Sequence, residues 1–444
     1  MRHLALTTAV IAVALAAPLA AQNRIDGQSP DAPELAAYGP LPVGVRQLAF
    51  TNPDQVDIVA ISPTGAPPAE LPRYDRPLTV EMWYPAAEGA TGDTSFKTLL
   101  RDGTTEVTLT GQAMRDAAPA TVDAPLPLVL LSHGYPGNRF LMSHLAENLA
   151  SKGYVVASID HTDSTYDNQR AFASTLVNRS LDQLFVLDQM ARMNTDAGSG
   201  MAGMIDAGNT ALVGYSMGGY GAIVTAGGGV SDFALNFAPH GTLGIHKQGS
   251  ETHEALPDPR IKTAVAIGPW GMQNGFWDAE GLAGIEIPML FIAGSNDTVS
   301  QYETGVRAIW EGASSIDRAL LTFDGGGHNT VAPIPAPVES FEAGVSGHYT
   351  DAVWDTVFMN NVGQHFVTAW FDLLLKGDTS KAAYLDLPPI GGDSYWKGFA
   401  EGTTAGLRYE TLAPTPIPLP ASVWMLALAL GGIGALRLRR ARTA

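Results

Sequence analysis

The sequence predicts an α/β fold built on a mostly parallel sheet with helices on both faces. Short apolar runs rich in β-branched residues recur along the chain, at residues 78–84, 126–132, 154–159, 210–215, 261–267, 288–293 and 319–323. Helical patterns, such as those at 140–152 and 182–192, lie between many of them. Continuous apolar strands that alternate with helices are typical of a parallel sheet covered on both faces. Ligands of such sheets bind beyond the carboxyl ends of the strands, where the chemically unusual residues of this chain lie.

Composition limits the class of protein and its partners. The chain has 444 residues, of which 45% are hydrophobic and 16% charged, so it is long and apolar enough for one large core domain with appendages. It has no cysteine, which excludes disulfides, thiolate metal sites and a cysteine nucleophile. The formal charge is -18, and five of the 26 basic residues lie in the two terminal segments, which leaves 21 bases against 44 acids in the body. This balance argues against a nucleic-acid partner.

The first residues have the layout of a secretory signal peptide. A basic start at Arg2 precedes an uncharged apolar run over residues 4–17, and small residues up to Ala21 offer a cleavage site. We therefore expect residues 1–21 to be a signal peptide and the Pro- and Ala-rich residues 22–43 to be an extended lead-in. A buried N-terminal helix is the alternative, although the run has no amphipathic pattern.

The other end predicts a tail associated with a membrane. Alternating prolines from Pro414 to Pro420 form a stiff spacer, so we expect residues 401–420 to be a linker. Residues 421–436 carry no charge and are followed by an arginine cluster. With the apolar residues before it, this stretch is marginally long enough to cross a bilayer with its arginines in the cytoplasm.

The order of the tail resembles a sorting signal. Residues 417–421 read IPLPA and precede the apolar helix and the arginines, as in the VPLPA-type C-terminal signals of Gram-negative bacteria, with Ile417 in place of Val. The resemblance implies that residues 421–444 insert in the membrane and are processed by an exosortase-type enzyme; an ordinary membrane anchor is the alternative. Both interpretations place the body, residues 44–400, outside the cytoplasmic membrane, in the cell envelope or secreted.

Ser216 is the candidate nucleophile. It is the central residue of a G-x-S-x-G motif between an apolar strand and a glycine-rich helix start. A serine needs a base and an exposed position to attack a carbonyl, and a sharp strand-to-helix turn provides the exposure. Gly214 and Gly218 satisfy the demand of that turn for small residues on either side. The alternative is a glycine-rich turn with a capping serine.

Acyl transfer also needs two N–H donors that stabilise the negative charge on the carbonyl oxygen. In a fold with this motif, one donor belongs to the residue after the nucleophile, here Met217, and the other to a loop after an earlier strand. The run at 128–137 is such a strand leading into a glycine turn, and its position makes the Tyr135 N–H the second candidate. We expect His133 to brace this loop rather than to take part in chemistry.

The candidate acid and base follow two later strands. Asp297 comes directly after the run at 288–293, and His328 follows the run at 319–323 through a glycine loop. The order Ser216, Asp297, His328 is that of the α/β-hydrolase fold. His328 would take the proton of Ser216, and Asp297 would fix the imidazole tautomer and stabilise the imidazolium.

Other histidines and acids are weaker candidates. Asp324 precedes the glycine loop and is expected to be a local helper at most. Five histidines do not follow a strand through a flexible glycine loop: His161, His240, His246, His348 and His365. No H-E-x-x-H spacing occurs, so we expect neither a metal nor another cofactor.

These landmarks resemble the exported bacterial branch related to dienelactone hydrolases and platelet-activating-factor acetylhydrolases, over about residues 43–387. The resemblance rests on residues 78–86, 131–134, 153–161 and 371–378, together with the elbow, Asp297 and His328. It implies hydrolysis of carboxylic esters. Dienelactone hydrolases use cysteine, whereas the acetylhydrolases and some polyester-cleaving relatives use serine, as Ser216 would be. By the same analogy Trp270 lines the acyl pocket; an aromatic that closes the core is the alternative.

The sequence therefore predicts a serine carboxylic-ester hydrolase that acts on a small-molecule, lipid or polymer ester. An amide or peptide hydrolase with the same triad is one alternative. A catalytically silent envelope binding protein with this fold is another. The sequence leaves open which ester is cleaved and whether the loop-rich residues 228–259 and 330–350 shape the cleft.

Overall fold

The computed structural model describes residues 23–415. The predicted signal peptide at 1–21 and the predicted membrane or sorting segment at 421–444 lie outside these residues. Among residues 23–415, no helix has both the length and the apolar character needed to cross a bilayer.

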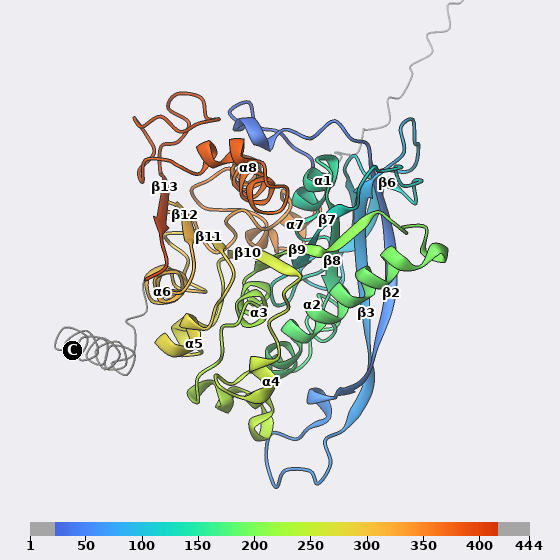
Figure 1. Ribbon diagram of the computed structural model, residues 1–444, viewed down its shortest axis with the longest axis vertical. Coiled ribbons are helices and arrows are strands. Elements are labelled where there is room, and N and C mark those ends of the chain that lie inside the picture. The colour runs from blue at the N-terminus through green and yellow to red at the C-terminus, as the bar shows by residue number, and fades with distance from the viewer. Residues whose placement is uncertain (1–22, 416–444) are drawn as a thin grey trace, which may run out of the picture.

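A 10-stranded sheet forms the centre of the described chain, with strand order β13-β12-β11-β10-β9-β7-β8-β3-β2-β6 (Figure 1). The strands from β12 to β8 in this order run parallel, and β3 and β13 are antiparallel to their inner neighbours. The strands are β2 (Val43–Val56), β3 (Arg73–Pro85), β6 (Met114–Arg115), β7 (Leu126–Ser132), β8 (Val155–Asp160), β9 (Ile205–Tyr215), β10 (Ile261–Ile267), β11 (Met289–Gly294), β12 (Arg318–Phe323) and β13 (Leu407–Leu412).

All the runs that the sequence assigns to strands are strands. Residues of β7, β11 and β12 are almost entirely buried, because helices cover both faces of the sheet and leave no polar side. This arrangement is an α/β-hydrolase fold, as predicted.

Two pairs of longer helices cover the sheet. α1 (Ser143–Ser151) and α8 (Thr356–Leu374) pack on one face, and α2 (Phe172–Thr195) and α3 (Met217–Thr225) pack on the other (Figure 1). Each face has its own hydrophobic core. The shorter helices are α4 (Glu251–Glu254), α5 (Ala279–Ala283), α6 (Ala308–Gly312), α7 (Glu339–Glu342), η1 (Glu34–Ala36), η2 (Ile58–Ala60), η3 (Ala197–Ser199), η4 (Phe233–Phe237), η5 (Pro239–His246), η6 (Met272–Asn274), η7 (Tyr302–Arg307), η8 (Ser346–His348) and η9 (Thr379–Tyr384).

The described part of the lead-in is anchored to the domain. β1 (Asn23–Arg24) joins β5 (Glu106–Thr110) and β4 (Ser95–Leu99) in a small 3-stranded sheet. Further along, the N–H of Leu35 donates to His365 Nδ1 on α8. These contacts fix an otherwise extended segment, which has few backbone hydrogen bonds of its own.

The fold continues past residue 400, the domain boundary expected from the sequence. β13, within the range expected to be a linker, pairs antiparallel with β12 over its whole length. Leu407 and Tyr409 are each 1% exposed, because they point into the core beneath α8. The prolines that predict the linker begin only after this strand.

The parallel strands end at a common edge, which positions the candidate site. β7, β9, β10, β11 and β12 end at Ser132, Tyr215, Ile267, Gly294 and Phe323. Every candidate catalytic residue lies within five residues of one of these ends. Residues distant in sequence are therefore brought together, as expected for this class of sheet.

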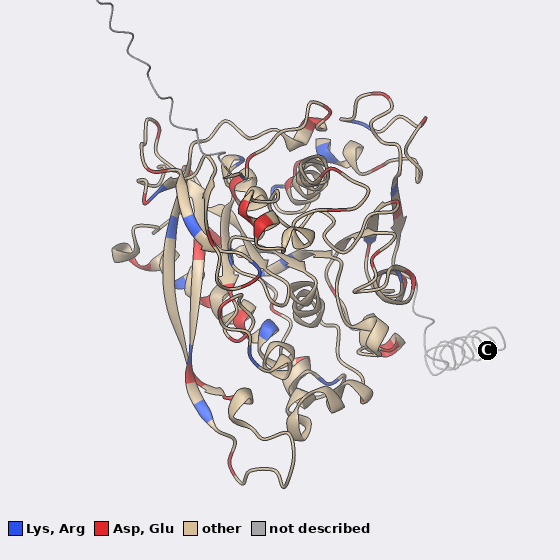
Figure 2. Cartoon of the chain, turned by 180° about the vertical axis from the view of Figure 1, so that it is seen from behind, with Lys and Arg blue, Asp and Glu red and all other residues tan. Residues whose placement is uncertain are grey.

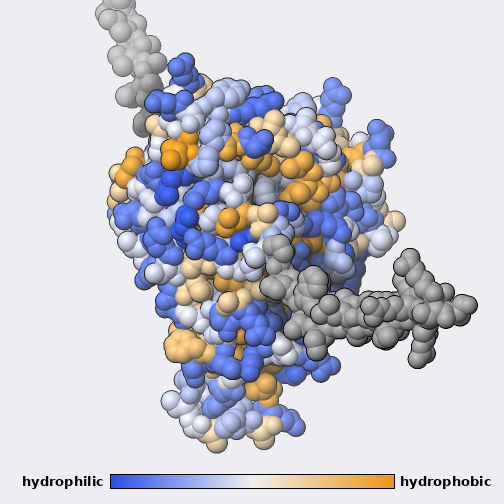
Figure 3. Space-filling view, turned by 60° about the vertical axis from the view of Figure 1, so that its left-hand side comes forward, coloured by the Kyte–Doolittle hydropathy of each residue, from blue (hydrophilic) through white to orange (hydrophobic). Residues whose placement is uncertain are grey.

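Acidic and basic residues are interspersed along the ribbon (Figure 2). Hydrophilic and hydrophobic residues are intermixed on the face drawn in Figure 3, with only small apolar clusters.

Candidate active site

Ser216 lies on a strained turn between β9 and α3. Its backbone has φ 54° and ψ -111°, a conformation that non-glycine residues rarely adopt. A Cβ on Gly214 would lie 2.2 Å from the carbonyl oxygen of Gly218, and one on Gly218 would lie 1.8 Å from that of Ser132. A side chain at either position would therefore clash with the backbone, which is why the sequence analysis expects small residues on both sides of the serine.

Ser216, His328 and Asp297 form a continuous line of hydrogen bonds, which we call the open line. His328 Nε2 lies 3.0 Å from Ser216 Oγ, and His328 Nδ1 lies 2.8 Å from Asp297 Oδ2. Because a carboxylate only accepts, Nδ1 of the neutral imidazole donates to Asp297, and Nε2 accepts from the Ser216 hydroxyl. This tautomer is the one that a general base for Ser216 requires.

Among residues 23–415, no lysine or arginine forms an ion pair with the carboxylate of Asp297. Its Oδ1 accepts from the N–H of Val299 at 2.8 Å and from that of Ser300 at 2.9 Å, while Oδ2 faces His328. The side chain of Asp297 is 1% exposed and that of His328 14% exposed. Two backbone donors compensate the buried charge, and the imidazole next to it reaches the cavity.

The loop that carries His328 is fixed by residues that the sequence analysis does not single out. The N–H of Gly327 donates to Asp351 Oδ2 at 2.6 Å, and the amide of Asn329 donates to the carbonyls of Gly347 and Thr350. Gly347 and Thr350 belong to the loop-rich residues 330–350, and Asp351 is the next residue along the chain, so this region does shape the site.

Two neighbouring titratable groups have hydrogen-bond partners outside the open line. Asp324 accepts from Arg408 on β13 at 2.8 Å and does not contact His328. His348 lies at the cavity and is bound to the hydroxyl of Tyr166 at 2.8 Å. Burial, with help from Arg101 and His328, lowers the pKa of His348 to about 3, so it stays neutral at ordinary pH.

The two candidate oxyanion donors flank Ser216. Within the described part of the chain, neither the N–H of Met217, at the start of α3, nor that of Tyr135 donates a hydrogen bond. A Cβ on Gly134, next to Tyr135, would lie 3.3 Å from Ser216 Cβ, so the loop after β7 is in contact with the nucleophile. Two N–H groups are therefore free to receive a ligand oxygen beside Ser216.

Trp270 is in a row of aromatic side chains next to the elbow. The backbone N–H of Trp270 donates to the carbonyl of Ser216 at 3.1 Å. Its ring lies 5.2 Å from that of Phe172, which in turn lies 5.0 Å from that of Tyr135, both nearly perpendicular. All three side chains are partly exposed. Phe172, at the start of α2, is a member of this row that the sequence pattern does not reveal.

A cavity of about 350 Å³ lies over the open line. It is lined by Arg101, Gly134, Tyr135, Pro136, Tyr215, Ser216, Val299, His328, Asn329, Gly347 and His348. Nucleophile, base and one candidate N–H donor thus share one hollow of a size suited to an acyl group or a small ester.

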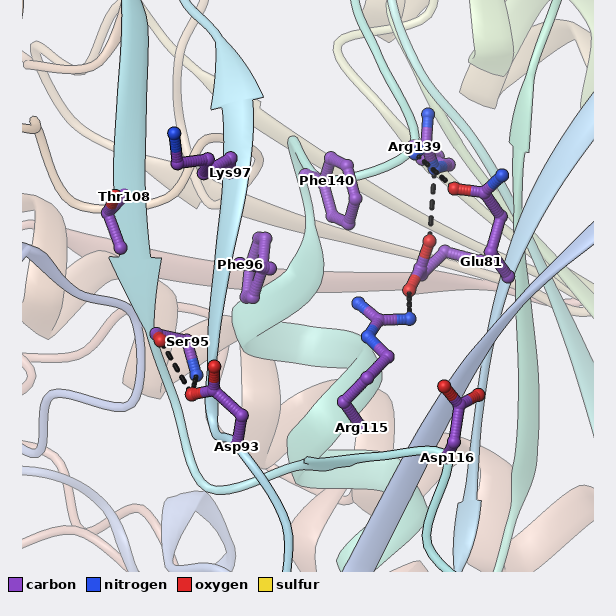
Figure 4. A pocket seen from close by; sticks show the side chains of 11 residues that line it. Glu81, Asp93, Ser95, Phe96, Lys97, Thr108, Arg115, Asp116, Arg139 and Phe140 are labelled. Carbon is purple, nitrogen blue, oxygen red and sulfur yellow. Dashed lines mark hydrogen bonds and ion pairs between the residues drawn. The ribbon is translucent and has the colours of Figure 1, made fainter.

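A larger cavity, of about 660 Å³, lies between the small sheet and the outer strands β3 and β2 (Figure 4). Figure 4 shows Glu81 between Arg115 and Arg139, and both guanidinium groups donate to its carboxylate. Its lining includes no histidine, and Glu81 is already paired with both arginines. Size alone therefore does not locate the chemistry.

Comparison with known proteins gives matches to esterases. A family model described as PETase, PET hydrolase-like, matches residues 116–241. Cutinase est2 of Thermobifida alba is 28% identical over 201 residues, which are 45% of this chain and 52% of that protein. Cutinase cut1 of Thermobifida fusca is 29% identical over 201 residues, which are 45% of this chain and 49% of that protein. The chain thus spans about half the length of the cutinases it matches.

Two further matches cover more of the chain. The bis(hydroxyethyl) terephthalate hydrolase of Streptomyces coelicolor is 24% identical over 267 residues, which are 60% of this chain and 69% of that protein. A solved ferulic acid esterase from Streptomyces cinnamoneus aligns with a TM-score of 0.52 and 23% identity, over 80% of this chain and 96% of that one. The structural match supports the fold. The finer resemblance to dienelactone hydrolases and acetylhydrolases stays a prediction.

Proposed function

We propose that this chain is a serine hydrolase of carboxylic esters that acts through an acyl-enzyme. The observation that carries the proposal is the open line, in which a strained serine, an imidazole and a carboxylate are in hydrogen-bond contact beneath a cavity. The names of the matching relatives, cutinases and a terephthalate-ester hydrolase, support the same class of reaction.

In this mechanism Ser216 Oγ attacks the ester carbonyl while His328 Nε2 takes its proton. The oxyanion accepts from the N–H groups of Met217 and Tyr135. His328 then protonates the departing alcohol, and the same imidazole activates the water that releases the acid. Asp297 orients the ring throughout and stabilises its charged form.

For the substrate, we propose an ester with an aromatic or otherwise apolar acyl group. The partly exposed rings of Tyr135, Phe172 and Trp270 begin at the cavity wall and continue beside Ser216. An apolar or aromatic group gains contact area and edge-to-face packing on such a row. The sequence of both ends supports action outside the cytoplasmic membrane, with the tail at 421–444 as anchor or sorting signal.

The test is turnover of p-nitrophenyl acetate and p-nitrophenyl benzoate by the wild type and by Ser216→Ala. We expect the variant to lose all measurable turnover and all labelling by a fluorophosphonate probe. Ser151→Ala, a change in a buried serine at the far end of α1, is the matched control and should leave both unchanged. Turnover retained in Ser216→Ala would refute the proposal, and a faster anilide than ester reaction would replace it with an amidase.

A further inference from the structure

A second Ser–His–Asp line lies buried behind the candidate site, and we call Ser132, His161 and Asp182 the sealed line. Ser132 Oγ lies 2.8 Å from His161 Nε2, and His161 Nδ1 lies 2.9 Å from Asp182 Oδ2. None of the three side chains is more than 2% exposed. Ester substrates cannot reach this serine, so the sealed line must have a role other than hydrolysis.

Arg76 neutralises the carboxylate of the sealed line. Its Nε and NH2 donate to the two oxygens of Asp182 at 2.8 and 2.9 Å. Burial alone would raise the pKa of Asp182, but Arg76 lowers it to about 2. Burial also lowers the pKa of His161 to about 3. The line thus holds a fixed, neutral imidazole, in which Nδ1 donates to Asp182 and Nε2 accepts from Ser132.

The sealed line connects to the loop that carries Tyr135. Ser132 is the last residue of β7, directly before His133, and the backbone N–H of His161 donates to His133 Nε2 at 3.2 Å. This bond leaves the proton of His133 on Nδ1, which lies 2.7 Å from the carbonyl oxygen of Gly134. The side chain of His133 therefore donates to Gly134 and braces the loop.

The carbonyl of Gly134 and the N–H of Tyr135 belong to one peptide unit. In a trans peptide these two groups point in opposite directions, so a donor that holds the carbonyl also aims the N–H. Arg179, fully buried on α2, supports the same segment by donating to the carbonyl of His133 at 2.8 Å. A hydrogen bond on the carbonyl further polarises the peptide and strengthens its N–H as a donor.

We propose that the sealed line and His133 are positioning residues that aim the N–H of Tyr135 at the oxyanion of the reacting ester. The proposal rests on the proposed function. It predicts an effect confined to the transition state, because the oxyanion exists only there and in the tetrahedral intermediates. The contributions of these residues should therefore appear in kcat and not in KM.

The test compares His133→Leu and His133→Asn with the wild type. The leucine variant loses the shorter of the two hydrogen bonds to the Gly134 carbonyl, since the other donor, Arg179, lies 3.5 Å from it. We expect kcat for p-nitrophenyl acetate to fall about 10- to 100-fold with KM unchanged. Affinity for phenylboronic acid, whose tetrahedral adduct with Ser216 mimics the oxyanion, should fall by the same factor. His133→Asn retains an N–H donor and should recover at least part of kcat.

His365→Leu is the matched control, since His365 is an equally buried histidine that accepts from Leu35 on the far side of α8. We expect it to lose stability but keep kcat. If His133→Leu does not fold, Ser132→Ala carries the same test, because it removes one hydroxyl and leaves the Arg76–Asp182 pair intact. A drop of kcat in Ser132→Ala of about tenfold is then expected.

Unchanged kcat, a change confined to KM, or an equal loss in His365→Leu would overturn the positioning role. These outcomes are distinct from failure of the proposed function. If the proposed function were wrong, the wild type itself would hydrolyse no ester and Ser216 would not react with the fluorophosphonate probe.

Discussion

The open line and the sealed line contain the same three residue types in the same order of hydrogen bonds, yet their surroundings differ. The serine and histidine of the open line face a cavity, and its carboxylate is held by two backbone N–H groups. The sealed line has no access to solvent, and its carboxylate is bound by a guanidinium. The difference teaches that a Ser–His–Asp contact does not identify a catalytic site. A catalytic site also needs access for a ligand, and it needs a carboxylate that is free to stabilise a charged imidazole.

The largest effect on turnover is expected for Asp297→Asn, which tests the role of the carboxylate in the open line. The amide can still accept from Val299 and Ser300, but it favours the wrong tautomer of His328. We expect kcat for p-nitrophenyl acetate to fall about 10⁴-fold. The urea midpoint of unfolding should stay close to that of the wild type, because no buried cation is left unpaired. A fall in kcat of less than tenfold would show that Asp297 does not support the base.

The same substitution in the sealed line, Asp182→Asn, should act mainly on stability. It removes the carboxylate that binds Arg76 through both oxygens, and leaves this buried guanidinium with a single carboxylate contact, to Asp163 at 3.1 Å. Breaking a buried pair from one side costs about 3–5 kcal/mol of unfolding free energy, and the remaining contact with Asp163 places the expected loss at the lower end of that range. Urea unfolding followed by tryptophan fluorescence measures it. The comparison fails if Asp182→Asn is as stable as Asp297→Asn.

Glu147 provides a third buried carboxylate for the comparison. Among the described residues, neither an arginine nor a histidine forms a hydrogen bond with it. Its Oε2 has no hydrogen-bond partner among the described residues, and burial raises its pKa from 4.5 to about 7. The folded state therefore binds more protons than the unfolded state between these values. The stability this group contributes is complete below pH 4.5 and is lost as the pH rises through 7.

Glu147→Gln should remove this dependence and, above pH 7, stabilise the protein by up to about 3 kcal/mol. The measurement is the unfolding free energy from urea titrations at pH 5 and pH 8. The wild type should lose more stability than the variant between the two. Parallel losses in both proteins would show that another group titrates.

The smallest effect is expected for Tyr215→Phe. The ring of Tyr215 lies 5.1 Å from that of His328, and its hydroxyl lies 3.3 Å from Asn329 Oδ1. Loss of this long hydrogen bond should cost about 1 kcal/mol of stability and leave kcat within about threefold. Urea unfolding and steady-state turnover of p-nitrophenyl acetate measure the two effects. A large loss of kcat would mean that the open line also depends on side chains around it, as the sealed line does.

The sequence predicts the strands and the elbow because their signals are local. Continuous apolar runs need helices on both faces, and Gly214 and Gly218 are imposed by backbone approaches within one turn. Strand order and the position of a residue after a strand end then suffice to bring Asp297 and His328 to Ser216. Each of these steps uses neighbours in sequence and one topological rule.

The rest depends on contacts that no local pattern carries. Arg76 on β3 and Asp182 on α2 are 106 residues apart, and each has the appearance of an ordinary surface charge in sequence. Asp351, which holds the loop of His328, lies in a region without periodicity. β13 could not be predicted from the sequence for the same reason. Its short run follows a Gly-rich loop, and it forms a strand because it pairs with the edge of β12.

The edge formed by β13 has a consequence for how the molecules behave together. Arg408 and Glu410 alternate with the buried residues of this strand, and they form ion pairs with Asp324 and Arg307 respectively. A strand from another chain that added to this edge would meet these paired charges, and part of the backbone there is already bonded to residues 389–391 of the same chain. The sheet is thereby protected from growing into intermolecular aggregates on that side, even though its interior strands are among the most apolar segments of the protein.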